Sequence, residues 1–118
     1  MSQPKLKLHV RKVSARASVI DIHGEVNASA ESGLMNAYNE ASHDGVRAII
    51  LNFDGLEYMN SSGIGLLVTP LIRVNRQKQK LLSFGLSAHY QQIFALTRLN
   101  EAIGVYQSES EALTAANA

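Results

Sequence analysis

The chain has 118 residues, a length typical of one domain and too short for two ordinary ones. It contains no cysteine, which excludes disulfides, thiolate metal sites and thiol catalysis. Eleven Lys and Arg residues oppose ten Asp and Glu residues, so the formal net charge is +1 and no whole-molecule field attracts nucleic acid or anionic lipid. We therefore expect a single domain over residues 1–118 that binds no nucleic acid.

The sequence also carries information about location. Residues 1–12 contain basic side chains among isolated apolar ones, without the apolar block of a secretory signal. A membrane-spanning helix needs about 20 apolar residues. The longest candidate, Ile64 to Ile72, is interrupted by Gly65 and Pro70. We expect a cytoplasmic protein with no direct membrane insertion.

The first half of the chain changes its periodicity twice. Apolar and polar residues alternate over residues 5–11 and 17–23, which predicts two strands that the short link 13–16 joins as an antiparallel hairpin. Helical spacing of apolar residues predicts a helix over 28–42. Residues 46–53 are almost continuously apolar, as expected of a central strand covered on both faces.

In the second half, a polar turn is expected over 54–60 and a helix over 61–77. Pro70 interrupts this helix, so we expect either a kink near Leu66 or a separate short first piece. The later pattern predicts a strand, a helix, a strand and a helix at 81–84, 88–99, 103–106 and 109–116. This order predicts an α/β fold with a mixed, mostly parallel sheet, an antiparallel N-terminal edge strand and about four α-helices.

Two segments follow predicted strands, 24–27 and 54–65, and binding sites of such sheets gather at the carboxyl ends of strands. The second contains Asn60-Ser61-Ser62-Gly63-Ile64-Gly65 between a buried strand and a helix. A helix start offers free N–H groups to an anion, and glycines let a second protein approach closely. The same residue types are also common helix caps, so local composition leaves both interpretations open.

The segment Leu51-Asn52-Phe53-Asp54-Gly55-Leu56-Glu57-Tyr58-Met59-Asn60-Ser61-Ser62-Gly63-Ile64-Gly65 resembles the strand, turn and helix start of the STAS domain family. Gly24-Glu25-Val26-Asn27 is similar to a second, weaker motif of that family. The resemblance spans nearly the whole chain and is strongest to the bacterial anti-anti-sigma factors, also called anti-sigma factor antagonists. It implies a STAS-like fold.

The resemblance implies a partner switch in transcription regulation. The unmodified antagonist binds an anti-sigma factor that is also a serine kinase, phosphorylation at the position of Ser61 releases it, and a serine phosphatase resets it. The helix that begins at Ser61 and the loop 25–27 are expected to form the docking face. Its expected residues are Glu25, Asn27, Tyr58, Met59, Asn60, Ser62, Gly63, Ile64 and Gly65. For Tyr58 and Met59, a place in the core is an equal alternative.

Asn27, Asn52 and Asn60 stand where members of the family usually carry Asp. Asn caps helices about as well as Asp, so we expect the fold to be unaffected. The intact Ser61-Ser62-Gly63 favours the switch, whereas the loss of a carboxylate beside Ser61 favours an alternative function. In it, the chain is an unphosphorylated STAS subunit that docks on the ATPase of a lipid or anion transporter.

Other chemistry is not indicated. The four histidines fall on separate predicted elements without metal-ligand spacing, and no base lies near Ser61 in the sequence. Gly63 and Gly65 lack the third glycine of a dinucleotide-binding motif. We expect a binding module that is not an enzyme and holds no cofactor or metal. The sequence leaves a monomer and a weak dimer equally open.

Overall fold

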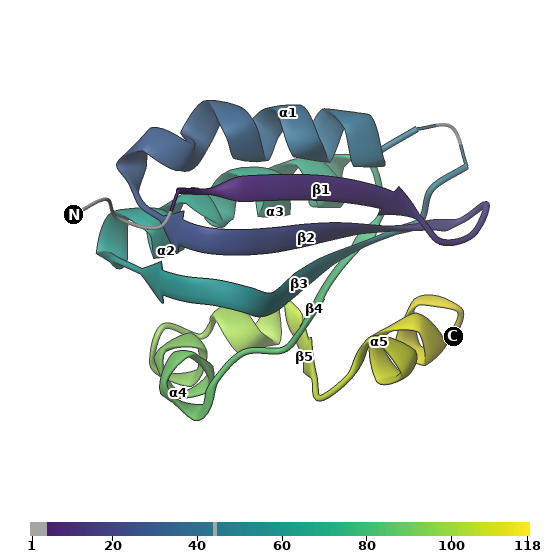
Figure 1. Ribbon diagram of the computed structural model, residues 1–118. Helices are drawn as coiled ribbons and strands as arrows, with labels where there is room; N and C mark the ends of the chain where they lie inside the picture. The colour runs from purple at the N-terminus through teal and green to yellow at the C-terminus, as the bar shows by residue number, and fades with distance from the viewer. Residues whose placement is uncertain (1–4, 44) are drawn as a thin grey trace.

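The computed structural model describes residues 5–43 and 45–118 (Figure 1). Its elements are β1 (Lys7–Lys12), β2 (Ala17–Val26), the short 3₁₀ helix η1 (Ala28–Ala30), α1 (Glu31–Ala41), β3 (Ala48–Met59), α2 (Ser61–Leu66), α3 (Val68–Arg76), β4 (Lys80–Phe84), α4 (Ala88–Leu96), a second 3₁₀ helix η2 (Leu99–Glu101), β5 (Gly104–Tyr106) and α5 (Glu109–Ala116).

The five strands form one sheet in the order β1-β2-β3-β4-β5. β1 pairs with β2 in antiparallel register, from Lys7 opposite His23 to Lys12 opposite Ser18. The other neighbouring strands are parallel. The predicted fold class, including the antiparallel edge strand at the N-terminus, is confirmed.

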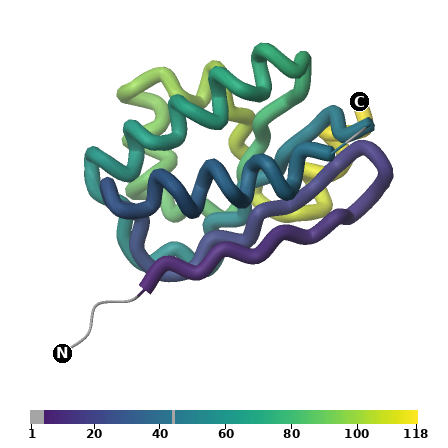
Figure 2. The backbone as a smooth tube through the Cα atoms, turned by 90° about the horizontal axis from the view of Figure 1, so that it is seen from above, coloured from purple at the N-terminus to yellow at the C-terminus, as the bar shows by residue number. Residues whose placement is uncertain are grey.

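Helices cover both faces of the sheet, which explains the continuous apolar sequence of β3. α1 and α3 lie over one face and run side by side, whereas α5 lies against the other (Figures 1 and 2). Ile49 and Leu51 belong to the larger hydrophobic cluster, and Ala48 and Ile50 belong to the cluster under α5. Successive side chains of a strand point to opposite faces, so a strand buried on both sides is apolar throughout.

The expected turn over 54–60 is wrong, because β3 continues through Met59. From Asn52 to Gly55, β3 advances three residues while the paired part of β2 advances two. From Leu56 to Tyr58, β3 advances two residues while β2 advances one. Each irregularity is a β-bulge that adds one residue to β3. The bulges place Asp54 and Glu57 outside the pairing, so polar residues occur within a strand. The expected loop 25–27 is also mostly strand, since β2 extends to Val26.

The expected interruption near Pro70 is confirmed as a separate short helix. α2 ends at Leu66, the buried Leu67 forms the junction, and α3 begins at Val68. Pro70 is the third residue of α3. In the first turn of a helix the N–H that proline lacks has no partner within the helix, so proline is tolerated there.

The pairing of β3 with β4 ends at Asn52, so the rest of β3 extends beyond β4. α4 packs beside this part of β3. The rings of Phe53 and Phe94 meet edge to face with centroids 6.3 Å apart. The Tyr90 hydroxyl accepts a hydrogen bond of 2.8 Å from the backbone N–H of Met59. α4 therefore covers the end of β3 that leads into α2.

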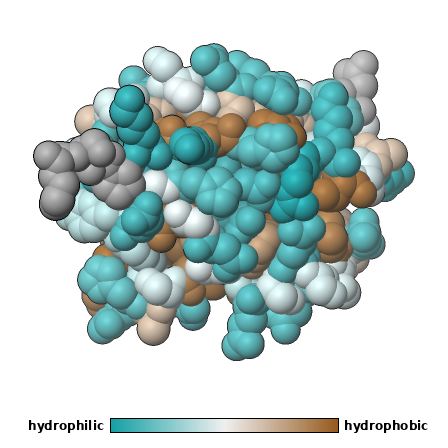
Figure 3. All heavy atoms as spheres, viewed as in Figure 1, coloured by the Kyte–Doolittle hydropathy of each residue, from teal (hydrophilic) through white to brown (hydrophobic). Residues whose placement is uncertain are grey.

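The side of the molecule seen in Figure 3 is mostly hydrophilic, with hydrophobic side chains between α1 and β1. Leu6, Leu8 and Val10 are half-buried there and pack against the core. In the described residues, no helix has the length and apolar character required to cross a bilayer.

Candidate functional site

Ser61 lies at the surface, at the carboxyl end of the central strand β3. Asn60 lies between β3 and α2 and caps α2. Its side-chain oxygen accepts a hydrogen bond of 2.8 Å from the N–H of Gly63. Ser61 and Ser62, the first two residues of α2, are both exposed. The sequence motif therefore presents two serine hydroxyls to solvent while its cap residue fixes the start of the helix.

The two glycines of α2 have different roles. A Cβ atom on Gly63 would lie 2.3 Å from the carbonyl oxygen of Val26, so Gly63 allows α2 to pack against the end of β2. A Cβ atom on Gly65 would meet nothing within 4 Å, and this residue is exposed. The sequence predicted that these glycines let a second protein approach closely. At Gly63, the end of β2 in the same chain makes that close approach instead.

The weaker motif lies next to the stronger one. Glu25 pairs with Tyr58 in the β2–β3 register, and η1 contacts α2. The Asn27 side chain accepts a hydrogen bond of 2.9 Å from the N–H of Ser29 and donates one of 3.1 Å to Glu25. The structure thus brings both expected parts of the docking face together beside Ser61.

Burial separates the expected docking residues into two groups. Met59 is 2% exposed and belongs to the core, and Gly63 is buried against β2. Both residues therefore serve packing within the chain, and their expected role as partner contacts stays a prediction. Tyr58, by contrast, is 53% exposed. Of the two alternatives, Met59 takes the place in the core, and a partner contact at the exposed Tyr58 stays a prediction.

A groove of about 620 Å³ begins at Ser61. We call it the Ser61 groove. One wall comes from the end of β3, α2 and the start of α3 (Tyr58–Ser61, Ile64, Gly65 and Val68), and the other from α4 and the segment after it (His89, Ile93, Thr97 and Leu99). The second wall was missed in the sequence, because it comes from a helix that begins 27 residues after Ser61. Its only local signal is the i, i+4 spacing of His89, Ile93 and Thr97 on one helix face.

The family model of the STAS domain matches residues 10–112. The chain belongs to the STAS domain family. The family and the fold that the sequence motifs indicated are thereby confirmed.

An anti-sigma-B factor antagonist of Staphylococcus aureus is 28% identical over 86 residues, which cover 73% of this STAS domain and 80% of that protein. The crystal structure of an anti-sigma factor antagonist from Mycobacterium paratuberculosis superposes with a TM-score of 0.82, at 18% identity, over 97% of this chain and 96% of that one. Both relatives are named as antagonists in sigma-factor regulation.

Two further structures share the fold. The Bacillus cell fate determinant SpoIIAA in its phosphorylated form superposes with a TM-score of 0.66, at 21% identity, over 92% of this chain and 97% of that one. A sulfate transporter family protein from Wolinella succinogenes gives a TM-score of 0.75, at 17% identity, over 92% of this chain and 89% of that one. STAS domains of this shape therefore occur both in regulators and in a transporter family.

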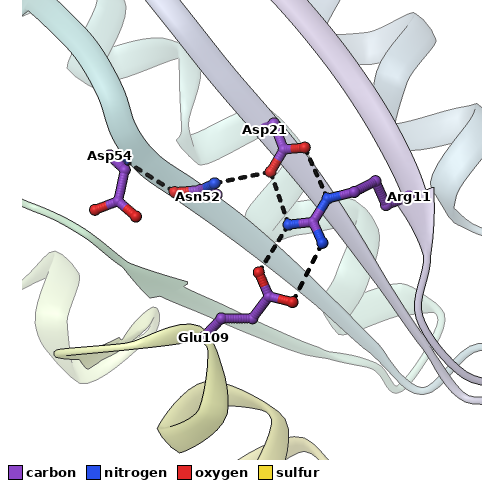
Figure 4. A network of polar contacts seen from close by, with 5 residues as sticks. All are labelled: Arg11, Asp21, Asn52, Asp54 and Glu109. Carbon is purple, nitrogen blue, oxygen red and sulfur yellow. Dashed lines mark hydrogen bonds and ion pairs between the residues drawn. The ribbon is translucent and has the colours of Figure 1, made fainter.

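A polar network joins β1, β2, β3 and α5 of this STAS domain on the α5 side of the sheet (Figure 4). The Arg11 guanidinium donates to both carboxylate oxygens of Asp21, at 2.8 and 2.9 Å, and to both of Glu109, at 3.2 and 2.8 Å. Glu109 is the first residue of α5, so the network holds that helix against β1 and β2.

Asn52 completes the network as a hydrogen-bond donor. Its amide nitrogen donates to Asp21 at 2.8 Å, and its oxygen accepts from the N–H of Asp54 at 2.9 Å. The expectation that Asn or Asp leaves the fold unaffected considered helix capping alone, whereas Asn52 lies in β3 and donates a hydrogen bond. A carboxylate at position 52 cannot donate, and it would face the carboxylate of Asp21.

We predict that this network makes stability depend on acid. The hydrogen bond from Arg11 lowers the pKa of Asp21 below its ordinary value of 3.8, burial opposes that shift, and the Asn52 hydrogen bond adds to it. A carboxyl group with a lowered pKa in the folded state contributes stability above its unfolded pKa and loses it as the pH falls through the folded pKa. Urea unfolding should show this loss only below about pH 4, and Asp21→Asn should reduce that part of the slope. An unchanged slope in Asp21→Asn would contradict the prediction.

Within residues 5–43 and 45–118, no group of three or more His, Cys, Asp or Glu side chains is placed to hold a metal ion. The polar side chains that line the Ser61 groove carry hydroxyls, the Asn60 amide and the imidazole of His89.

Proposed function

We propose that this STAS domain is an anti-sigma factor antagonist whose binding to an anti-sigma factor kinase is switched off by phosphorylation of Ser61. The observation that carries the proposal is the exposed Ser61 hydroxyl at the first residue of α2, beside the segment 25–27 and the exposed ring of Tyr58. The similarity to named antagonists supports it. So does the existence of a phosphorylated structure of the same fold.

The position of Ser61 determines how a phosphate acts. A phosphoserine carries about −1.5 to −2 charges at pH 7 and three acceptor oxygens. At the first residue of a helix this charge meets free N–H groups, so it stabilises the helix. Asn60 adds no negative charge next to it. The modified protein would therefore stay folded, and the added charge would release the partner by repulsion and steric blockage.

The partners follow from this proposal. They are an anti-sigma factor with serine kinase activity and a serine phosphatase that removes the phosphate. Both would act in the cytoplasm, where sigma factors control transcription. The domain itself would act by binding, as a monomer or a weak dimer.

We predict that Ser61→Ala abolishes phosphorylation. The purified protein would be incubated with ATP and each anti-sigma factor kinase of the source organism, and the mass of the intact protein measured. The wild type and Ser62→Ala, which removes the neighbouring exposed hydroxyl, should each gain one phosphoryl group, and Ser61→Ala none. A gain in Ser61→Ala, or none in the wild type with any kinase, would contradict the proposal.

A second candidate function is favoured by the likeness to the sulfate transporter family protein. In it, the same surface docks permanently on a transporter ATPase and Ser61 is never modified. Asn27 and Asn60, which lack a carboxylate beside the serine, fit this alternative. One measurement distinguishes the two functions. If the phosphorylation switch operates, Ser61→Asp should weaken kinase binding at least ~100-fold. If the domain docks permanently, the same change should not release its partner.

A further inference from the structure

Four large hydrophobic residues of the described chain are exposed to solvent. They are Tyr58 at 53%, Val68 at 42%, Ile72 at 48% and Leu96 at 77% exposure. Tyr58 and Val68 line the groove. A monomeric soluble protein rarely exposes a contiguous apolar patch of this kind unless another molecule covers it.

The other two residues extend the walls of the groove away from Ser61. Ile72 follows Val68 by one helical turn of α3, and Leu96 follows Ile93 by three residues of α4. Residues three or four apart lie on one face of a helix. The apolar surface is therefore a strip that runs from Ser61 between α3 and α4.

The shape of this strip favours a macromolecular occupant. A small molecule that filled the 620 Å³ beside Ser61 would leave Ile72 and Leu96 uncovered. Two helices with apolar residues at i, i+3 and i+4 spacing form the kind of groove that accepts the apolar face of a third helix. An extended peptide pairs with a sheet edge instead. The strand edge at this groove is the end of β3 beyond its pairing with β4, and there the Met59 N–H is already bonded to the Tyr90 hydroxyl.

The identity of the occupant follows from Ser61, and here the inference rests on the proposed function. Ser61 is itself part of the groove wall. A kinase that brings ATP to this hydroxyl must cover the surface around it, and so must cover the near end of the groove. The strip then continues beneath the same bound protein.

We propose that the groove between α3 and α4 binds an amphipathic helix of the same anti-sigma factor kinase, with apolar side chains at helical spacing placed between Val68 and Ile72 on one side and Ile93 and Leu96 on the other. Ser61 controls whether the partner stays bound, and the strip supplies apolar binding surface that is independent of the phosphate.

The test measures the dissociation constant of the kinase that phosphorylates Ser61, in the presence of ADP, for Ile72→Glu and Leu96→Glu. Each change places a carboxylate in the apolar contact and should weaken binding at least ~10-fold. Ala95→Glu is the matched control, because it adds the same charge at an exposed residue next to Leu96 but on another face of α4. Its dissociation constant should stay within about twofold of the wild type. Ile64 is unsuitable because it packs partly against the core.

A photo-crosslinking amino acid in place of Leu96 identifies the occupant. We expect crosslinks to a helical segment of the kinase with apolar residues three and four apart. Crosslinks to a loop, to a strand or to a second copy of this chain would overturn the inference. A small molecule found covering the strip in the complex, in place of a kinase helix, would also overturn it.

The two proposals fail in different ways. If the wild type is phosphorylated and Ile72→Glu and Leu96→Glu bind the kinase as tightly as the wild type, the groove inference is wrong and the proposed function stands. If no kinase binds or modifies the wild type, both are wrong. Because both side chains are exposed, thermal unfolding should show that the variants remain folded.

Discussion

Gly63→Ala should lower the free energy of unfolding by about 2 kcal/mol and move Ser61. The added Cβ atom would lie 2.3 Å from the carbonyl oxygen of Val26 and 3.0 Å from the Met59 side chain. The first contact is with backbone at the end of β2, which cannot rotate away as a flexible side chain can. α2 must therefore shift, although alanine itself is a better helix former than glycine.

Gly65→Ala provides the matched control, since it makes the same change two residues later in α2. Its Cβ atom would meet nothing within 4 Å, so this variant should be as stable as the wild type or up to about 1 kcal/mol more stable. Urea denaturation measures both values. The Ser61 kinase assay should show slower phosphorylation of Gly63→Ala only. Equal unfolding free energies for the two variants would mean that α2 does not depend on this contact.

Gly63 shows which part of the site could be read from the sequence. The motif gave the correct place, because a cap residue, two serines and a helix start are local features that the pattern specifies. It did not show that one glycine serves packing and the other remains open. That difference depends on the position of Val26, which pairing between β2 and β3 determines over a long distance in sequence.

The fold was predicted well where periodicity was clean and poorly where bulges occur. The hairpin, the central strand and the interruption at Pro70 each follow from patterns of a few residues. The second half of β3 does not, because each bulge changes which residues face the core. Asp54 and Glu57 then look like a turn, while Gly55, Leu56 and Tyr58 stay paired with β2.

The groove illustrates a different limit. Ile72 and Leu96 have ordinary helical surroundings in the sequence, and apolar residues on a predicted helix are normally assigned to the core. Only the packing of the helices in three dimensions shows that these two side chains remain exposed on the helices that form the walls of the Ser61 groove. Such a surface has to be found in three dimensions.

Asn52→Asp should cost about 2 to 3 kcal/mol of unfolding free energy at pH 7. The change keeps the acceptor for the Asp54 N–H but removes the hydrogen bond to the Asp21 carboxylate, and a lost bond to a charged group costs about 1.5–3 kcal/mol. It also places a second carboxylate within hydrogen-bonding distance of the first. Arg11 already serves Asp21 and Glu109, so it cannot neutralise a third negative charge.

The pH dependence of that loss separates charge repulsion from a change of shape. Two adjacent carboxylates raise the pKa of one of them above its unfolded value. A carboxyl group with a raised folded pKa is tolerated while protonated and destabilises the fold as the pH rises through that pKa. The deficit of Asn52→Asp should therefore be smaller at pH 4.5 than at pH 7.

Asn60→Asp is the matched control for this experiment. Its oxygen only accepts the Gly63 N–H, a role that Asp fills equally well, so the variant should stay within about 0.5 kcal/mol of the wild type at both pH values. If Asn52→Asp were equally neutral, the amide at position 52 would not be needed to hold Asp21. If instead only Asn52→Asp is destabilised, and mainly at neutral pH, then Asn52 serves the network that anchors α5, and its departure from the usual Asp carries no information about Ser61. Asn60 would then be the substitution that bears on the phosphate switch.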